Sequence, residues 1–239
     1  MIKLLSEEKI GEFLKFCGTD LAGAVICTRF HAYGLNSDNA LFWYIEGENG
    51  EISGVLSKSD NVLTVCPFEL ANREEVIAFS KITGCSQITR PGKFTLKYSG
   101  ENPDFTADGS VKDITGENLK DVFPVIFPKS KNKDLFSFWY TDASHKIRHS
   151  LIHGKGVYVG EKCVSAALTS GETENTAVIS SVSTLEEYRR RGFGRLAVLS
   201  LAEFLSGMNK QVFLMTDSEN TKKWYEKSGF ETINNINVV

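Results

Sequence analysis

The residues best suited to chemistry lie between Val182 and Arg195, in the sequence VSTLEEYRRRGFGR. Four arginines fall within seven positions of this window, and Gly192 and Gly194 open a predicted helix. Free backbone N–H groups and the helix dipole favour an anion at a helix start, and arginines add forked contacts to phosphate oxygens. The window therefore predicts a site for a diphosphate, with a solvated basic turn as the simpler alternative.

Two classes of diphosphate ligand compete for this site. Gly192-x-Gly194-x-x-Ala197 fits the dinucleotide pattern, and Asp217 at the end of the next predicted strand could accept a ribose hydroxyl. However, the dinucleotide turn is tight, whereas nine residues separate Val182 from Gly192 here. Asp217 also follows Gly192 by 25 residues, where about 20 are expected. These differences favour coenzyme A over a dinucleotide.

Hydrophobic periodicity predicts the elements that position the window. For the second half of the chain it predicts helices at 119–127 and 134–148, the latter capped by Asp134, strands at 151–159, 162–169 and 176–182, a helix at 192–206, a strand at 211–215, a helix at 219–228 and a strand at 230–239. The arginine window thus connects a strand to a helix, as a phosphate site requires.

The first half of the chain is predicted to repeat part of this order. A helix capped by Ser6 and ending near Cys17 precedes strands at 41–46, 52–58 and 62–66 and a helix at 73–83, for which Asn72 and Glu75 resemble a capping box. The polar stretch 98–116 reads as a linker. We therefore predict two domains, 1–108 and 109–239, that are distant structural copies.

Composition and charge exclude several classes of protein. Apolar residues make up 41% and charged residues 24%, as in ordinary globular proteins, and the net charge of −3 with a pI near 5.9 argues against a general nucleic-acid binder. Residues 1–108 carry 10 basic and 15 acidic side chains, whereas residues 109–239 carry 17 and 15. The net charge is therefore +2 for the second domain and −5 for the first, so the second domain is better suited to an anionic ligand.

The cysteines and the apolar runs indicate a compartment. The chain has five cysteines, an odd number, and no C-x-x-C motif. This pattern predicts buried, reduced thiols and not a disulfide framework or a zinc site. The first residues place acids where a signal peptide needs an apolar core, and the longest apolar run, 40–45, is too short to cross a bilayer. We expect a cytoplasmic protein that does not bind membranes.

Two sequence blocks resemble the GNAT superfamily of N-acetyltransferases. Arg189-Arg190-Arg191-Gly192-Phe193-Gly194 is similar to the family signature [Arg/Gln]-x-x-Gly-x-[Gly/Ala] that follows the fourth strand. A later strand and helix end in Tyr225-Glu226-Lys227-Ser228-Gly229-Phe230, which is similar to a second family block. The resemblance covers about residues 111–239, and for residues 1–108 it depends only on the order of elements.

The resemblance implies an α+β fold: a mixed, mostly antiparallel sheet flanked by helices, in two tandem GNAT-like domains of which the first is degenerate. It implies acetyl-CoA as cosubstrate and no metal. Tyr225 matches the residue that protonates the leaving thiolate. The implied cofactor-binding residues are Val182, Thr184, Arg189, Arg190, Arg191, Gly192, Phe193, Gly194 and Arg195, with Ser218 or Asn220 contacting the cofactor arm.

Departures from the family pattern leave roles open. Glu186 and Arg190 stand where the family often has proline and glycine, and the predicted strand 176–182 offers no carboxylate as general base. His145, His149 and His153 are four residues apart, but the predicted helix stops before His153, so an acceptor-site or structural role is favoured over a metal site.

The sequence therefore predicts an acyl-CoA-dependent N-acyltransferase. The expected acceptor is a primary amine of a small molecule or peptide, attacked directly without a covalent enzyme intermediate. Nucleic acid and membranes are not expected partners, and the protein is expected to be a monomer or homodimer. The alternatives are a catalytically weak CoA-binding regulatory module and a dinucleotide-binding enzyme.

Overall fold

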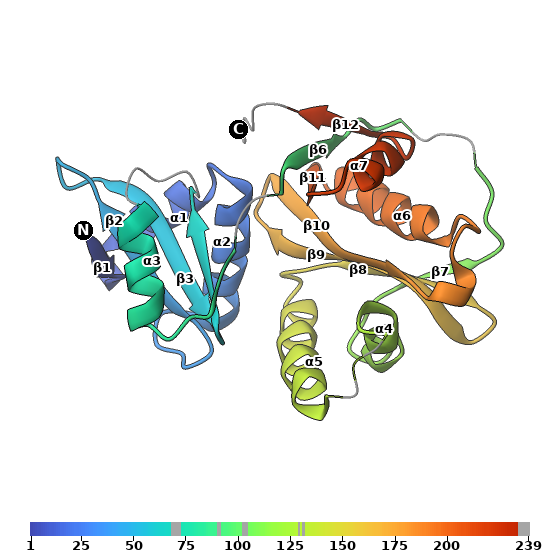
Figure 1. The fold of residues 1–239 in the computed structure, drawn as a ribbon, viewed down its shortest axis with the longest axis horizontal. Helices are drawn as coiled ribbons and strands as arrows, with labels where there is room; N and C mark the ends of the chain where they lie inside the picture. Colours follow the sequence, from blue (N-terminus) through green and yellow to red (C-terminus); the bar gives the residue numbers. More distant parts are fainter. Residues whose placement is uncertain (68–72, 90–91, 102–104, 129, 131, 234–239) are drawn as a thin grey trace. The chain divides into compact units, whose positions relative to one another are not determined.

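The computed structural model describes the chain except residues 68–72, 90–91, 102–104, 129, 131 and 234–239. The chain divides into two compact units. The first contains Met1–Gly92 and Gly171–Thr173, and the second contains Lys93–Ser170 and Glu174–Asn234. Each unit has its own sheet (Figure 1).

The first unit is a five-stranded sheet with helices on both faces. Its elements are β1 (Ile2–Leu4), a 3-10 turn at Glu7–Lys9, α1 (Ile10–Cys17), α2 (Leu21–Tyr33), β2 (Leu41–Glu46), β3 (Ile52–Ser59), β4 (Val62–Cys66), α3 (Arg73–Ile82) and β5 (Gln87–Thr89). The sheet order is β1-β2-β3-β4-β5. All neighbours are antiparallel except β4 and β5, which are parallel.

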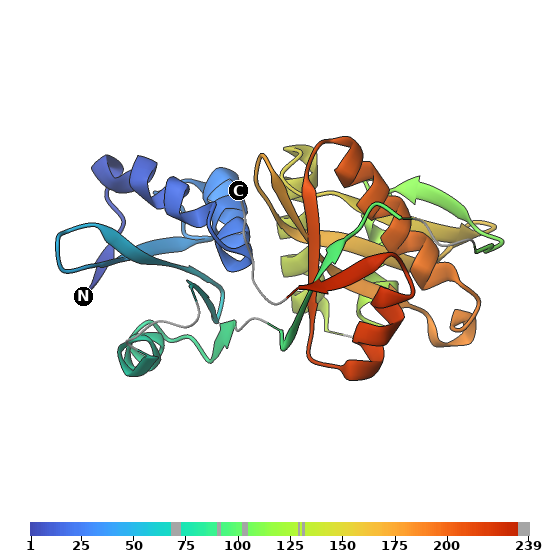
Figure 2. The ribbon, with the colours of Figure 1, turned by 90° about the horizontal axis from the view of Figure 1, so that it is seen from above.

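Alternation along the strands gives this sheet two apolar faces. One face packs on α1 and α2 through a cluster that includes Phe13, Ile26 and Phe42. The other packs on α3, where the rings of Trp43 and Phe79 meet edge to face at 5.1 Å. Figure 2 shows α3 across the sheet from α1 and α2.

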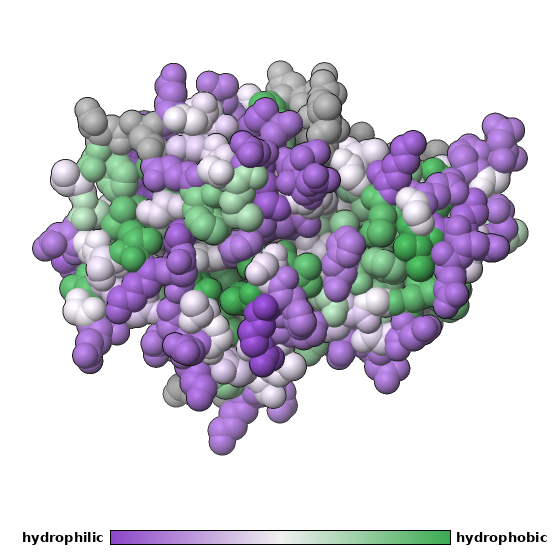
Figure 3. All heavy atoms as spheres, turned by 180° about the vertical axis from the view of Figure 1, so that it is seen from behind, coloured by the Kyte–Doolittle hydropathy of each residue, from purple (hydrophilic) through white to green (hydrophobic). Residues whose placement is uncertain are grey.

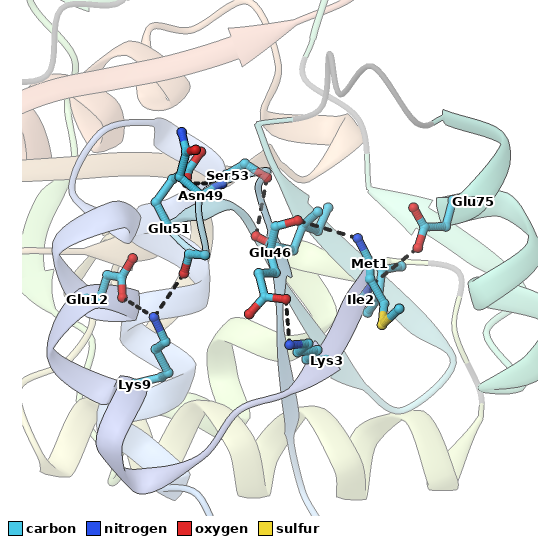
Figure 4. A network of polar contacts seen from close by, with 12 residues as sticks. Met1, Ile2, Lys3, Lys9, Glu12, Glu46, Asn49, Glu51, Ser53 and Glu75 are labelled. Carbon is cyan, nitrogen blue, oxygen red and sulfur yellow. Dashed lines mark hydrogen bonds and ion pairs between the residues drawn. The ribbon is translucent and has the colours of Figure 1, made fainter.

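Polar side chains fasten the first strand and the first helix (Figure 4). Lys9 pairs with Glu12 at 2.6 Å, and Glu12 in turn accepts a hydrogen bond from the amide of Ile52 at 2.7 Å. Glu75 accepts one from the amide of Ile2 at 3.2 Å. Glu75 therefore holds β1; its predicted capping partner, Asn72, lies outside the described residues.

The second unit is built on a seven-stranded sheet. Its elements are β6 (Phe94–Tyr98), β7 (Ser110–Asp113), α4 (Leu119–Ile126), α5 (Lys133–Arg148), β8 (Gly154–Val159), β9 (Lys162–Glu172), β10 (Thr176–Thr184), a 3-10 turn at Glu186–Tyr188, α6 (Phe193–Gly207), β11 (Gln211–Thr216), α7 (Glu219–Glu226) and β12 (Phe230–Ile233). The sheet order is β12-β6-β11-β10-β9-β8-β7.

Helices cover both faces of this second sheet. Figure 1 shows α4 and α5 on one face and α6 and α7 on the other. The apolar residues of α6 and α7 pack on one large cluster, in which Leu96, Ala197 and Leu201 have no exposed surface. Leu119 and Val122 of α4 anchor the cluster on the opposite face. The predicted α+β class, a mostly antiparallel sheet flanked by helices, is confirmed.

The units divide earlier than the predicted boundary after Asp108. The strand β6 precedes that boundary, yet it pairs antiparallel with β11, as in Leu214↔Leu96, and with β12, as in Phe230↔Tyr98. The predicted linker 98–116 also contains β7, whose Val111 pairs with Val157 of β8. The prediction of a featureless linker there was wrong, because short strands gain their stability from distant partners.

The strands β10 and β11 separate along their length. They pair in parallel from Thr176↔Gln211 to Ile179↔Leu214, whereas β10 continues to Thr184 and β11 to Thr216. Ser181 has φ +44°, a left-handed conformation uncommon for a residue with a Cβ atom. Ser181 lies two residues beyond the last pair of β10 with β11, at the start of the unpaired end of β10.

Three local predictions differ from the structure. The helix α2 was not predicted because most of its residues are apolar and His31 is its one exposed residue, so no polar face sets off an apolar stripe. The cap of α5 is Asn132, whose side chain accepts hydrogen bonds from the amides of Asp134 and Leu135, and not Asp134 itself. Ser6 likewise makes no side-chain cap.

The cysteines lie in the interior, and the surface mixes apolar and polar side chains. Cys17, Cys27, Cys66, Cys85 and Cys163 are all buried free thiols, as predicted. On the face drawn in Figure 3, apolar side chains form separate patches among polar ones. None of the helices in the described part of the chain combines the length and apolar character that a membrane span requires.

Candidate functional site

A cavity of about 720 Å³ opens at the start of α6 in the second unit. It is lined by the end of β10, the turn that follows it, the first residues of α6, and α7. The residues that line it are Phe105, Thr106, Val182, Ser183, Thr184, Tyr188, Arg189, Arg190, Gly192, Phe193, Gly194, Arg195, Asn220, Thr221, Trp224 and Tyr225. All of the predicted site residues except Arg191 and Ser218 are among them.

The first turn of α6 presents unsatisfied donors to this cavity. Gly192 is the N-cap residue, with φ +84° and no side-chain cap. In the part of the chain that the structure describes, nothing accepts a hydrogen bond from the amides of residues 192–195. These amides and the positive end of a 15-residue helix form a cradle suited to an anion such as phosphate.

The four arginines of the window have different surroundings. Arg189 donates through Nε to the carbonyl of Thr184 at 3.1 Å, and Arg195 donates to the hydroxyl of Ser228 at 3.2 Å. Arg190 lines the cavity with φ +62°. Arg191 does not line it: its guanidinium lies over the rings of Tyr188 and Phe193, at 5.4 and 5.0 Å.

Gly194 allows α6 to approach β10 closely. A Cβ atom at this position would lie 3.0 Å from Oγ1 of Thr184 and 3.6 Å from the ring of Trp224. Oγ1 of Thr184 is itself 2.8 Å from the hydroxyl of Ser165, a fully buried residue that also donates to the carbonyl of Ser183 at 2.8 Å. Hydrogen bonds from Ser165 of β9 thus hold the end of β10 in place, and the start of α6 packs against that end.

Tyr225 of α7 is the most buried titratable side chain of the cavity wall, with 7% of its surface exposed. Its ring packs against those of Trp224 and Phe230. Burial raises the pKa of Tyr225 to about 12. The hydroxyl is therefore protonated at neutral pH, as a proton donor must be.

The structure separates the two candidates at the start of α7. Ser218 is the N-cap of the helix, and its hydroxyl accepts a hydrogen bond from the amide of Thr221 at 3.3 Å. Asn220 lines the cavity, whereas Ser218 does not. Of the two, Asn220 is therefore the one placed to contact a ligand.

Several lining residues were not predicted. Ser183, Tyr188, Thr221 and Trp224 are close in sequence to predicted site residues, so their neighbourhood could have pointed to them. Phe105 and Thr106 could not be found in this way, because they belong to the predicted linker.

The dinucleotide alternative lacks its acidic residue. Asp217 accepts a hydrogen bond from the amide of Lys93 at 2.9 Å, so its carboxylate caps the start of β6. The connection between β10 and α6 also contains a 3-10 turn at Glu186–Tyr188, which is not the tight turn of a dinucleotide fold.

The histidines form a pair and a separate contact. The rings of His145 and His149 lie 4.6 Å apart at the end of α5, and His153 packs on Phe204 at 5.2 Å. Within the described ranges, no three metal-ligating side chains are grouped closely enough to hold a metal ion.

Comparison with known proteins relates the second unit to a sequence family. Residues 156–239 match the family described as FR47-like protein. This range includes the cavity's β10, α6 and α7. No curated protein matches the sequence significantly.

Comparison with solved structures extends the likeness to nearly the whole chain. A tandem GNAT protein from the clavulanic acid biosynthesis pathway shares 11% identity over 97% of this chain and 95% of its own, with a TM-score of 0.60. A Drosophila protein shares 13% identity over 97% of this chain and 95% of its own, with a TM-score of 0.63. The chain spans only 59% of the length of a GNAT-family protein from Novosphingobium aromaticivorans, at 18% identity over 59% of this chain and a TM-score of 0.46.

Proposed function

Because this chain has the tandem GNAT fold, we propose that it is an acyl-CoA-dependent N-acetyltransferase whose active site is the cavity of the second unit. The acyl donor is acetyl-CoA, and the acceptor is a primary amine of a small molecule or peptide. The observation that carries the proposal is the set of unsatisfied amides of residues 192–195, which face a cavity that also contains a protonated tyrosine.

The residues of the cavity fit coenzyme A in three places. The amides at the start of α6, with Arg190 beside them, suit the diphosphate. The end of β10, free of β11 beyond Ile179, offers its edge to the amides of the pantetheine arm, in the way that a sheet accepts an extra strand. Asn220 can add a side-chain hydrogen bond to the same arm.

In the proposed complex, the thioester lies between the separated ends of β10 and β11, near Tyr225. The amine attacks the carbonyl carbon as the free base, the carbon–sulfur bond breaks, and the hydroxyl of Tyr225 donates its proton to the leaving thiolate. The nitrogen then loses one proton to solvent, and Tyr225 regains one from solvent. A backbone amide where β10 and β11 separate stabilises the oxyanion, and holding both reactants in line supplies much of the rate.

Ligand binding and turnover test the two parts of the proposal separately. Isothermal titration is expected to show that CoA and acetyl-CoA bind and that NAD does not bind. A thiol-release assay across a panel of amines is expected to show acetyl-CoA-dependent turnover with at least one of them. Tight CoA binding with no turnover on any amine would favour a regulatory CoA-binding module, and no CoA binding would refute the site.

A further inference from the structure

Residues Phe105–Gly109, here called the strap, cross the first turn of α6. They follow β6 and precede β7, within the segment that the sequence predicts to be a linker (Figure 1). Their exposure alternates: Phe105, Ala107 and Gly109 are half-buried, whereas Thr106 and Asp108 are exposed. This alternation is typical of an extended segment with one face against the protein.

The inward positions of the strap each meet a residue of the anion cradle. The ring of Phe105 lies 5.5 Å from the guanidinium of Arg195. A Cβ atom at Gly192 would lie 3.2 Å from Cβ of Ala107, and one at Gly109 would lie 3.1 Å from the ring of Phe193. The strap therefore packs along the start of α6, beside the amides that face the cavity.

The strap is also part of the cavity wall. Phe105 and Thr106 line the cavity together with Arg195 and Asn220. Because the strap contacts residues 192–195, it borders the end of the cavity that holds the diphosphate in the proposed function. An aromatic ring and an arginine side by side are groups on which a purine nucleotide can pack.

We propose that the strap is a binding element for the 3′-phospho-ADP end of coenzyme A, so that Phe105 and Ala107 contribute to the affinity for the nucleotide and not for the pantetheine arm. This inference rests on the proposed function. It adds a contact from outside both sequence blocks that resemble the GNAT superfamily, and it assigns a role to residues that precede the predicted second domain.

A charge placed on the strap separates a binding role from a structural one. In Ala107→Asp, the new carboxylate faces the start of α6, where it competes with a phosphate but favours the helix dipole. We expect the Kd for CoA to rise at least tenfold relative to the isosteric Ala107→Asn, while the Kd for pantetheine changes less than twofold. The melting temperature of the Asp variant is expected to equal or exceed that of the Asn variant.

A second pair of variants tests the ring of Phe105 without introducing a charge. Phe105→Ala is expected to raise the Kd for CoA about fivefold and to leave the Kd for pantetheine unchanged. Phe138→Ala, which removes a half-exposed ring on α5 that does not line the cavity, is the matched control and is expected to change neither.

The outcomes distinguish this inference from the proposed function. A parallel loss of affinity for CoA and pantetheine in the Asp and Phe105 variants would mean that the strap only supports the fold of the site, and would overturn the inference. Unchanged CoA binding in all variants would overturn it too, while leaving the proposed function intact. A wild-type protein that binds no CoA would refute the proposed function itself, and the inference with it.

Discussion

The two halves of the chain repeat one topology but differ at the start of the third helix, where the second half has its cavity. Both follow the order strand, two helices, three antiparallel strands, helix, and a strand parallel to the last of the three. In the second half the connection into the third helix carries Arg189–Arg195 with two glycines. In the first half the corresponding helix, α3, begins with Arg73 followed by Glu74 and Glu75. The repeated fold therefore does not by itself make an anion site.

The halves also differ after the parallel strand. In the second half β11 leads to α7, which supplies Tyr225, Asn220 and Trp224 to the cavity. In the first half β5 is followed by β6, which belongs to the sheet of the second unit. The first half thus has no described counterpart of α7, because the strand that follows β5 already belongs to the second unit. We expect the first half to bind no CoA, and the predictions below test this division of roles.

The largest effect is expected from removing β6. A chain of residues 109–239 lacks a strand that lies between β11 and β12, including the fully buried Leu96, so we expect it to be insoluble or unfolded. A chain of residues 93–239 keeps the strand and is expected to unfold cooperatively. Circular dichroism and urea titration of the two fragments measure this. A native-like, cooperative 109–239 fragment would restore the boundary after Asp108.

The next largest effect is expected from Tyr225→Phe. The hydroxyl has no hydrogen-bond partner among the described residues, so its loss is expected to leave the melting temperature nearly unchanged while kcat falls on the order of 100-fold. The KM for acetyl-CoA is expected to stay within about twofold, because the ring and its packing remain. A kcat close to that of the wild type would exclude Tyr225 as the proton donor.

The pH dependence follows from the same tyrosine. Burial raises the pKa of Tyr225 from its ordinary value near 10 to about 12. The donor proton is therefore present from neutral pH through about pH 10, and its loss sets no alkaline limit to kcat within that range. Steady-state rates measured from neutral to moderately alkaline pH check this. A fall of kcat with an apparent pKa below about 9 that disappears in Tyr225→Phe would contradict it.

A smaller effect is expected from the adjacent arginines, which form a matched pair. Arg190 lines the cavity, whereas Arg191 is not among its lining residues and lies over the rings of Tyr188 and Phe193. Arg190→Ala is expected to raise the Kd for CoA about tenfold, because it removes one charge-assisted contact. The Kd of this variant is also expected to depend less on salt concentration than that of the wild type. Arg191→Ala is expected to raise it less than threefold. Equal effects in isothermal titration would mean that the arginines act only through their summed charge.

The cavity residues between 182 and 195 were easier to predict from the sequence than the segments that pack around them, β6 and the strap. Residues 182–195 are contiguous and connect a strand to a helix, so their sequence alone indicates an anion cradle. The sequence does not decide between Ser218 and Asn220, because only the structure shows that Ser218 caps α7 and that Asn220 lines the cavity. The placement of β6 and the strap could not be predicted, because a short strand's partners and an extended segment's contacts are set by distant residues.

The smallest effect is expected from two glycines, one in each half, that have left-handed backbones. Gly84, with φ +72°, has open space within 4 Å of the point where a Cβ atom would stand, whereas at Gly192, with φ +84°, a Cβ atom would meet Ala107 of the strap. Replacing either by alanine is expected to lower the free energy of unfolding by about 1–2 kcal/mol, because a Cβ atom disfavours this conformation. Only Gly192→Ala is expected to weaken CoA binding, because it shifts the first turn of α6 and its amides. Urea titration and isothermal titration of both variants measure the two quantities, and a loss of CoA affinity in Gly84→Ala would show that the first half takes part in binding after all.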